Sequence, residues 1–353
     1  MTDKPHWAHN DEEDAVAQGS TTRRPTIRMV AERAGVSVAT VSYVLSGRPG
    51  AQATGVREDT AVRVRSAAED LGYVPNSSAR AVRTGRTGTI LLSLTMLSDP
   101  WSLSIVRAVS RSAAAAGLTP LIAADTDWLP LVNSVQSDAI FIDSATPKDQ
   151  DLFSSLAARG HNLVVLHSDL KPDGFDVVRS EEPAGCRLLA DRLIDQFETV
   201  GLLTPKGLEP ASVSHRAMAY VEALEARGMD VRPQWCPPAG DDETSAFRAA
   251  LTVLRSPDRP RALMATSEYI AQAALGAAAV LGLRPGTDIG IAGVGNAFDD
   301  RSGGVGLTSV GPEGFFDAVA DLLVGRATGA DTSPRRAHAF AWQVFDRETT
   351  LGI

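Results

Sequence analysis

The segment from Thr26 to Gly47 most constrains the fold of this chain, because two helix-forming stretches follow each other with almost no residues between them. Thr26 can cap a first helix, and Gly35 supplies the left-handed backbone that ends it. Ser37 can cap a second helix directly afterwards. The apolar positions predict one buried face on each helix, made by Ile27, Val30, Ala31 and Ala34 in the first and by Val41, Val44 and Leu45 in the second.

Two helices joined by three or four residues that include glycine form a helix-turn-helix, whose second helix offers its first residues to base edges in the major groove. An ordinary αα-hairpin has the same local pattern. A third amphipathic helix is predicted in "TAVRVRSAAEDLGYVPN", with Val62, Ala67 and Leu71 inside and with Gly72 and Pro75 ending it. The third helix favours the helix-turn-helix.

Charge is distributed unevenly along the 353 residues. The net charge is −9, yet the segment from Thr22 to Thr87 holds eleven arginines and only five acidic residues. Arginine side chains that neutralise phosphates supply the sequence-independent part of DNA affinity, although a solvated basic face has the same composition. Residues 1–21 are polar and acidic, and we expect them to form a disordered tail.

The stretch after the third helix, "PNSSARAVRTGRTGTILLSL", allows Asn76 to cap a short helix from Ser77 to about Val82. The ordered motifs "TIRMVAERAGVSVATVSYVL" and "LGYVPNSSARAVRTGRTGTI" resemble the LacI-type (lactose- and galactose-repressor) family of bacterial transcription regulators. The resemblance implies a small all-α helix-turn-helix DNA-binding head over 22–74. It also implies a hinge helix and linker over 75–87, which enters the minor groove when two chains pair on an operator, and a ligand-responsive body over 88–353.

The resemblance also implies which residues contact DNA. Val38 and Ala39 match base-reading positions, whereas Tyr43 stands where many members carry an arginine. Arginine binds guanine through two hydrogen bonds, but tyrosine has one hydroxyl and a flat ring, so the preferred half-site should shift. Val82 replaces a leucine wedge and is one methylene shorter, so the kink it makes is expected to be shallower or more dependent on sequence. The implied set is Thr26, Ser37, Val38, Ala39, Thr40, Ser42, Tyr43, Asn76, Ala79, Arg80, Val82 and Arg83.

From Thr87 onward, short apolar strands alternate with helical patterns of about 10 to 15 residues, which predicts an α/β body with parallel sheets covered on both faces. The resemblance makes this a periplasmic-binding-protein-like body of two doubly wound parallel-sheet subdomains, with a ligand cleft at the carboxyl ends of the strands. We expect the chain to cross between subdomains near Ser180, Val310 and Ala330. The N-subdomain would then hold about 88–180 and 310–330, and the C-subdomain about 181–309 and 331–353.

The resemblance is weakest at the ligand site. Arg216 matches an arginine that binds a ligand hydroxyl or carboxylate, and Trp101 matches a cleft aromatic, although a core tryptophan is the alternative. Glu268 replaces an aspartate, and Asn296 falls where members carry an acidic pair. Sugar recognition relies on paired Asp and Asn side chains, because a buried hydroxyl left unpaired costs roughly 1 to 3 kcal/mol. This chain lacks much of that set, so we expect the cleft to be specialised for an unusual ligand, reduced in function or unoccupied. The expected ligand residues are Trp101, Asp143, Arg216, Glu268 and Asn296.

Several function classes are excluded by the motifs. "GIAGVG" has the wrong glycine spacing for a dinucleotide site, and H-E-x-x-H, G-x-S-x-G and P-loop motifs do not occur. Cys186 and Cys236 lack metal-ligand spacing, which fits a reducing compartment and predicts neither a metal nor a cofactor. No apolar run approaches the roughly 20 residues that span a bilayer, and the first residues do not resemble a signal peptide.

We therefore expect a cytoplasmic, nucleoid-associated, homodimeric DNA-binding regulator that acts as a repressor on a palindromic operator. A small molecule, such as a sugar or related metabolite, would modulate its affinity. It would have no enzymatic activity and no membrane partner. The alternative is a DNA-binding regulator with a degenerate cleft, independent of ligand or controlled by a protein partner. A solute binder or an enzyme would need a signal sequence or a catalytic constellation that these residues do not provide.

Overall fold

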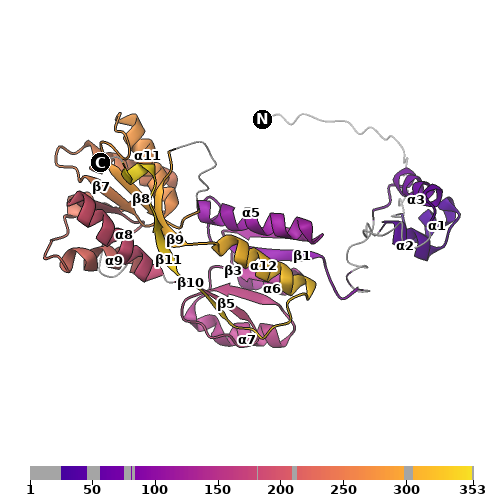
Figure 1. Ribbon diagram of the computed structural model, residues 1–353. Coiled ribbons are helices and arrows are strands. Elements are labelled where there is room, and N and C mark those ends of the chain that lie inside the picture. The colour runs from indigo at the N-terminus through magenta and orange to yellow at the C-terminus, as the bar shows by residue number, and fades with distance from the viewer. Residues whose placement is uncertain are drawn as a thin grey trace, which may run out of the picture. The chain divides into compact units, whose positions relative to one another are not determined.

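The computed structural model describes residues 25–45, 56–74, 81, 84–180, 182–208, 213–297 and 305–351. The chain divides into two compact units, residues 1–80 and residues 81–353, which we call the head and the body (Figure 1). The predicted tail, 1–21, lies outside the described residues.

The head consists of three short helices, α1 (Ile27–Ala34), α2 (Val38–Leu45) and α3 (Glu58–Asp70). Its first two caps are the predicted ones. The Thr26 hydroxyl accepts a hydrogen bond from the Met29 backbone N–H at 3.4 Å, and Gly35 ends α1 with φ at 65°. The Ser37 hydroxyl accepts from the Thr40 N–H at 3.1 Å. These caps set the short connection between α1 and α2.

A single small core holds the three helices together, and Val30, Val41 and Val64 are fully buried in it. The prediction that Val62 lies inside was wrong, because its side chain is 54% exposed and the neighbouring Ala61 is buried instead. The helix α3 begins at Glu58, which is earlier than the predicted start, and its buried residues are Ala61, Val64, Ala67 and Ala68.

The first of two sheets in the body contains six parallel strands in the order β10-β5-β4-β3-β1-β2. In chain order they are β1 (Thr89–Leu94), β2 (Thr119–Ala124), β3 (Ala139–Ile142), β4 (Leu163–Leu166), β5 (Asp176–Ser180) and β10 (Ala337–Phe340). The helices α5 (Pro100–Ala115) and α12 (Phe315–Thr328) pack on one face. The helices α6 (Trp128–Ser134) and α7 (Gln150–Ala158) pack on the other.

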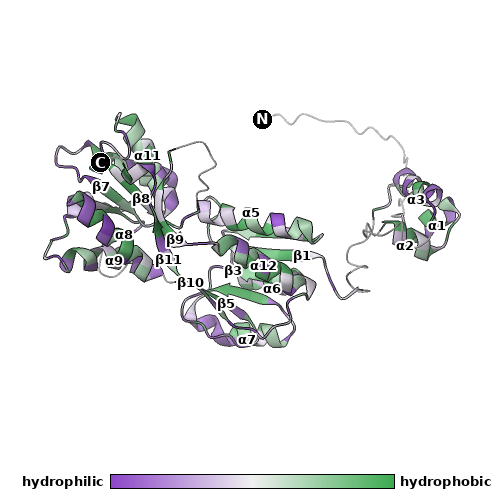
Figure 2. Ribbon diagram, in the orientation of Figure 1, coloured by the Kyte–Doolittle hydropathy of each residue, from purple (hydrophilic) through white to green (hydrophobic). Residues whose placement is uncertain are grey.

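The apolar side chains of β1 alternate between the two faces of the first sheet, so both faces must be covered by helices. Ile90, Leu92 and Leu94 pack with α5 and α12, whereas Leu91 packs with α6 and α7. Strands of this sheet are green in Figure 2, while the helices carry green and purple residues on opposite sides. This pattern is typical of a parallel sheet between two helical layers, as predicted.

The second sheet has the order β11-β9-β8-β7-β6 and is parallel except for β11, which runs antiparallel to β9. Its strands are β6 (Val200–Leu203), β7 (Ala262–Ala265), β8 (Gly290–Val294), β9 (Thr308–Pro312) and β11 (Trp342–Phe345). It is covered by α8 (Glu182–Phe197), α9 (His215–Glu225), α10 (Glu243–Arg255) and α11 (Glu268–Val280), and α13 (Glu348–Leu351) packs against β8. Figure 1 shows α8 and α9 on one side of this sheet and α11 on the other.

The chain passes between the two sheets three times. The first passage follows Ser180, and the second follows Pro312, because β9, which contains Val310, belongs to the second sheet. The third passage was predicted near Ala330, and this was wrong. The strand β10 still belongs to the first sheet, so the chain crosses between Phe340 and Trp342.

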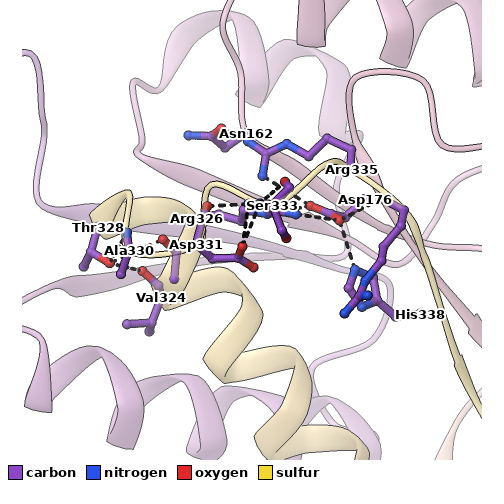
Figure 3. Close-up of polar contacts among 12 residues, drawn as sticks. Asn162, Asp176, Val324, Arg326, Thr328, Ala330, Asp331, Ser333, Arg335 and His338 are labelled. Carbon is purple, nitrogen blue, oxygen red and sulfur yellow. Dashed lines mark hydrogen bonds and ion pairs between the residues drawn. The ribbon is translucent and has the colours of Figure 1, made fainter.

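A buried ion cluster holds the end of α12 against β5 (Figure 3). Asp176 is fully buried, and Arg326 contacts its carboxylate through Nε at 2.8 Å and Nη2 at 3.0 Å. His338 Nε2 lies 2.9 Å from the same carboxylate, and Arg335 contacts it at 3.4 Å. Burial alone would raise the pKa of Asp176, but the hydrogen bonds with His338 and Arg326 outweigh burial and lower it.

A second carboxylate, that of Asp138, fixes the point where the chain enters β1. It accepts hydrogen bonds from the backbone N–H groups of Thr87 and Gly88, each at 2.7 Å, and from the Thr87 hydroxyl at 3.0 Å. Asn162 donates to the Asp138 carbonyl at 2.9 Å and accepts from Arg335 at 2.5 Å. Polar contacts therefore run along the amino ends of the strands from β1 to the Asp176 cluster.

Candidate functional site

The first turn of α2 is exposed on the surface of the head. Ser37, Val38 and Ala39 are exposed, and Val38 is 41% exposed although it is apolar. The fully buried Val41 fixes the rotation of α2 and therefore keeps this turn outside. The other predicted contact residues are exposed at Thr26 and half-buried at Thr40, Ser42 and Tyr43.

Two of the arginines in the head are paired within it. Arg33 contacts Asp70 at 3.0 Å and joins α1 to α3, and Arg65 contacts Glu58 at 3.3 Å within α3. Both arginine side chains are 56% exposed, so the two pairs add little to stability. Arg28, Arg57 and Arg63 are exposed on the same head and are candidates for contacts with phosphates.

The predicted hinge residues Asn76, Ala79, Arg80, Val82 and Arg83 lie outside the described residues. The prediction that they contact DNA therefore stays a prediction.

A cleft of about 730 Å³ opens at the carboxyl ends of the strands in both sheets of the body. Its walls come from residues that follow β1, β3 and β4 in the first sheet and β6, β7 and β8 in the second, which is where ligands bind in open α/β sheets. Polar lining residues include Thr95, Asp99, Asp143, His167, Asp169, Glu182, His215, Arg216 and Asp241. Apolar and aromatic lining residues include Met96, Trp101, Leu166, Tyr269, Phe315 and Trp342.

Arg216, at the start of α9, lines the cleft as predicted but is already engaged. Its Nε and Nη2 atoms contact the Glu182 carboxylate at 2.9 and 3.1 Å, and its Nη1 donates to the Thr266 carbonyl at 2.7 Å. Burial would raise the pKa of Glu182, but the charge of Arg216 outweighs it and lowers that pKa. A guanidinium has five N–H donors, so Arg216 can still donate to a ligand beside this pair.

Two aspartates lie on the opposite wall. Asp99 caps α5 by accepting from the Trp101 N–H at 2.9 Å, and Asp143, which follows β3, accepts from the Thr95 N–H at 3.0 Å and its hydroxyl at 2.8 Å. Burial raises the pKa of both carboxyls despite these hydrogen bonds, and the charge of Asp99 raises that of Asp143 further. The sequence prediction included Asp143 but missed Asp99, whose position before Pro100 marks it only as a helix cap.

Trp101 combines the two roles that the sequence left open. Its ring lies 5.8 Å from that of Phe315, 5.9 Å from Phe316 and 6.4 Å from Phe141, so it packs on the core of the first sheet. It also lines the cleft. Packing against three rings holds Trp101 in a fixed orientation toward the cavity.

Glu268 and Asn296 were predicted as ligand residues, and this stays a prediction, although neither is among the described residues that line the cleft. The Glu268 carboxylate is buried and accepts from the Ser309 hydroxyl at 2.5 Å and the Ala297 N–H at 2.9 Å. The side-chain amide oxygen of Asn296 accepts a hydrogen bond from Arg347 Nη2 at 2.8 Å. Both side chains tie loops to the second sheet.

Glu182 and Trp342 were missed because no local pattern marks them. Glu182 begins α8 in a stretch that departs from the family motif, and Trp342 follows the third passage, which was placed too early along the chain. No group of three or more His, Cys, Asp or Glu residues arranged to hold a metal occurs among the described residues. Within those same residues, no helix is long and apolar enough to cross a membrane.

Comparison with known families assigns both units. Residues 26–76 match the bacterial regulatory proteins of the lacI family, and residues 190–350 match a periplasmic binding protein-like domain. The head is a LacI-family helix-turn-helix domain. The predicted fold class of the chain, a helical head followed by an α/β body with parallel sheets, is thereby confirmed.

Relatives of the chain include the HTH-type transcriptional repressor PurR of Serratia proteamaculans, 26% identical over 81% of this chain and 84% of the relative. The PurR of Proteus mirabilis is 26% identical over 87% of this chain and 93% of its own length. The chain is thus a DNA-binding transcriptional regulator related to repressors, and the prediction that it is not an enzyme agrees with these relatives.

Solved structures share the fold. A LacI-family regulator from Silicibacter pomeroyi is 21% identical, with a TM-score of 0.68 over 92% of this chain and 99% of that one. The lac repressor dimer bound to operator and the anti-inducer ONPF is 20% identical, with a TM-score of 0.63 over 93% of this chain and all of that one. The regulator CelR in complex with cellobiose is 25% identical, with a TM-score of 0.55 over 92% of this chain and all of that one.

Proposed function

We propose that this protein binds a palindromic DNA operator as a homodimer in the cytoplasm and represses transcription, with an affinity set by a small molecule in the cleft. The observation that carries the proposal is the exposed first turn of α2, held outward by the buried Val41 on a basic head. A turn of this kind fits a major groove, and two copies would read the two halves of a palindrome. Tyr43 would then give this protein its own half-site preference.

Ligand control follows from where the cleft residues originate. Asp99, Trp101 and Asp143 belong to the first sheet and its helices, whereas Glu182 and Arg216 belong to the second. A ligand that touches both sets favours one angle between the subdomains. The coupling free energy between ligand and DNA in such two-site systems is about 1 to 3 kcal/mol, which is 5- to 150-fold in affinity.

A second candidate function is a DNA-binding regulator without an effector, controlled by occupancy or by a protein partner. The internal hydrogen bonds of Glu268 and Asn296 favour it, because two positions expected to bind ligand are occupied by the protein itself. The remaining polar lining of the cleft favours the ligand-controlled function.

The test is fluorescence anisotropy of the full chain with palindromes selected from a random DNA pool. At 0.15 M salt, the selected palindrome should bind at least about 10³-fold more tightly than scrambled DNA. Ala39→Asp should abolish this preference, because it places a negative charge on the exposed turn of α2. Ser66→Asp adds the same charge on an exposed position of α3 and serves as the control. Equal affinity for palindrome and scrambled DNA would refute the proposal.

A further inference from the structure

The described lining of the cleft is rich in carboxylates, namely those of Asp99, Asp143, Asp169, Glu182 and Asp241. It carries one guanidinium, that of Arg216, which is paired with Glu182. Within the described chain, neither lysine nor arginine lies at ion-pair distance from four further lining carboxylates, which are Asp99, Asp143, Asp169 and Asp241. Among the described lining residues, carboxylates therefore outnumber guanidinium groups, and the charge of Arg216 acts on Asp99 without an ion-pair contact.

The two best-placed carboxylates are partly desolvated. Asp99 and Asp143 each accept hydrogen bonds from neighbouring backbone N–H groups, which fix their positions but bring no positive charge. Burial raises the pKa of both. A cation placed between them would recover electrostatic energy that these groups lose on folding.

The walls beside these carboxylates are aromatic. Trp101 is held rigid by three phenylalanine rings, and Trp342 and Tyr269 line the same cavity. Aromatic faces attract cations, and a protonated amine satisfies carboxylates and rings at once.

We propose that the effector of this protein is an organic cation, a molecule with a protonated amine that Asp99 and Asp143 bind and an apolar or hydroxylated part that packs on Trp101. The proposal rests on the effector-controlled function above and narrows its ligand class. The same carboxylates would repel phosphorylated sugars and organic acids.

The first experiment measures thermal stability of the full chain without DNA, using two triplets of compounds that share a scaffold and differ in charge. The first triplet is glucosamine, glucose and glucose 6-phosphate, and the second is tyramine, 4-ethylphenol and 4-hydroxyphenylacetate. The amine of at least one triplet should raise the Tm while its anionic counterpart does not. A larger rise with a neutral or anionic member, or no rise with either amine at millimolar concentration, would overturn the proposal.

The second experiment locates the amine with charge-neutralising variants and isothermal titration. Asp99→Asn keeps an acceptor for the Trp101 N–H, and Asp143→Asn can still pair with Thr95. Each should weaken amine binding about 10- to 100-fold, because a hydrogen bond to a charged group is lost. Asp127→Asn is the matched control, since Asp127 caps α6 at 3.0 Å as Asp99 caps α5 but does not line the cleft. Equal losses in all three variants, or none in the first two, would contradict the assignment.

Operator binding separates this proposal from the function on which it rests. If the amine binds but operator affinity does not change, the ligand class holds and effector control fails. If a neutral or anionic compound binds and changes operator affinity, effector control holds and the cationic ligand class is wrong.

Discussion

Replacing Asp176 should destabilise the body more than any change to an exposed ion pair. Asp176→Asn keeps the shape of the side chain but removes the charge that neutralises Arg326, and these side chains are 0% and 1% exposed. The change leaves Arg326 with the partly exposed Asp331, at 3.2 Å, as an ion-pair partner, so the cost should lie near the lower end of the range of about 3 to 5 kcal/mol for breaking a buried ion pair. For a body of this size, that corresponds to a Tm lower by roughly 10 °C.

The assay is urea denaturation of the full chain, followed by tryptophan fluorescence and circular dichroism. Asp317→Asn is the control, because Asp317 pairs with Arg111 at 2.8 Å but is 73% exposed, and its loss should cost less than about 1 kcal/mol. The double variant Asp176→Leu, Arg326→Met should lose less than the two single changes together, since it leaves neither charge behind. A cost for Asp176→Asn equal to that of Asp317→Asn would refute the reasoning.

The difference in unfolding free energy between the wild type and Asp176→Asn should depend on pH in one direction. The folded pKa of Asp176 lies below the ordinary value of 3.8, so its contribution is fully present above that value and is lost as pH falls through the folded pKa. The difference between the wild type and Asp176→Asn should therefore be constant near neutral pH and shrink in acid below 3.8. A difference that grows in acid would contradict the lowered pKa.

Other residues give further predictions. Gly35→Val should cost about 1 to 2 kcal/mol, because φ is 65° there, and should speed hydrogen exchange in α1. Burial raises the pKa of Glu268 above 4.5, so the stability that the protonated carboxyl contributes is lost as pH rises through the folded pKa. Glu268→Gln should therefore flatten the pH dependence of the unfolding free energy above 4.5, as measured by urea titrations. Tyr43→Arg should change the preferred base pair of each half-site in binding-site selection, and identical profiles would show that Tyr43 does not read bases. Arg216→Ala should reduce the thermal shift caused by a bound effector, and an unchanged shift would remove Arg216 from the site.

The head was predictable because its signals are local. Thr26, Gly35 and Ser37 act within three or four residues of their positions in sequence, and the structure places their caps as expected. The error at Val62 lies near the start of α3, where the N-cap residue Arg57 makes no side-chain hydrogen bond and so leaves no signal for the start of the helix.

The cleft was less predictable because its residues depend on partners that are distant in sequence. The Glu268 carboxylate is held by Ser309, which lies 41 residues away. Glu182 is brought into the cleft by Arg216, which lies 34 residues away. The strand β10 was placed in the wrong subdomain because the Asp176 cluster that retains it joins residues 150 and 162 positions apart. No helical or strand periodicity reports such pairings.

The Asp138 contacts indicate where this protein can be recombined with its relatives. Because Asp138 holds the backbone N–H groups of both Thr87 and Gly88, these two residues belong structurally to the body rather than to the segment that leads from the head. A hybrid repressor that takes its head from another family member should therefore be joined at Gly85 or Arg86. A junction placed after Gly88 would take residues 87 and 88 from the other protein and so replace the residues whose backbone N–H groups donate to Asp138 here.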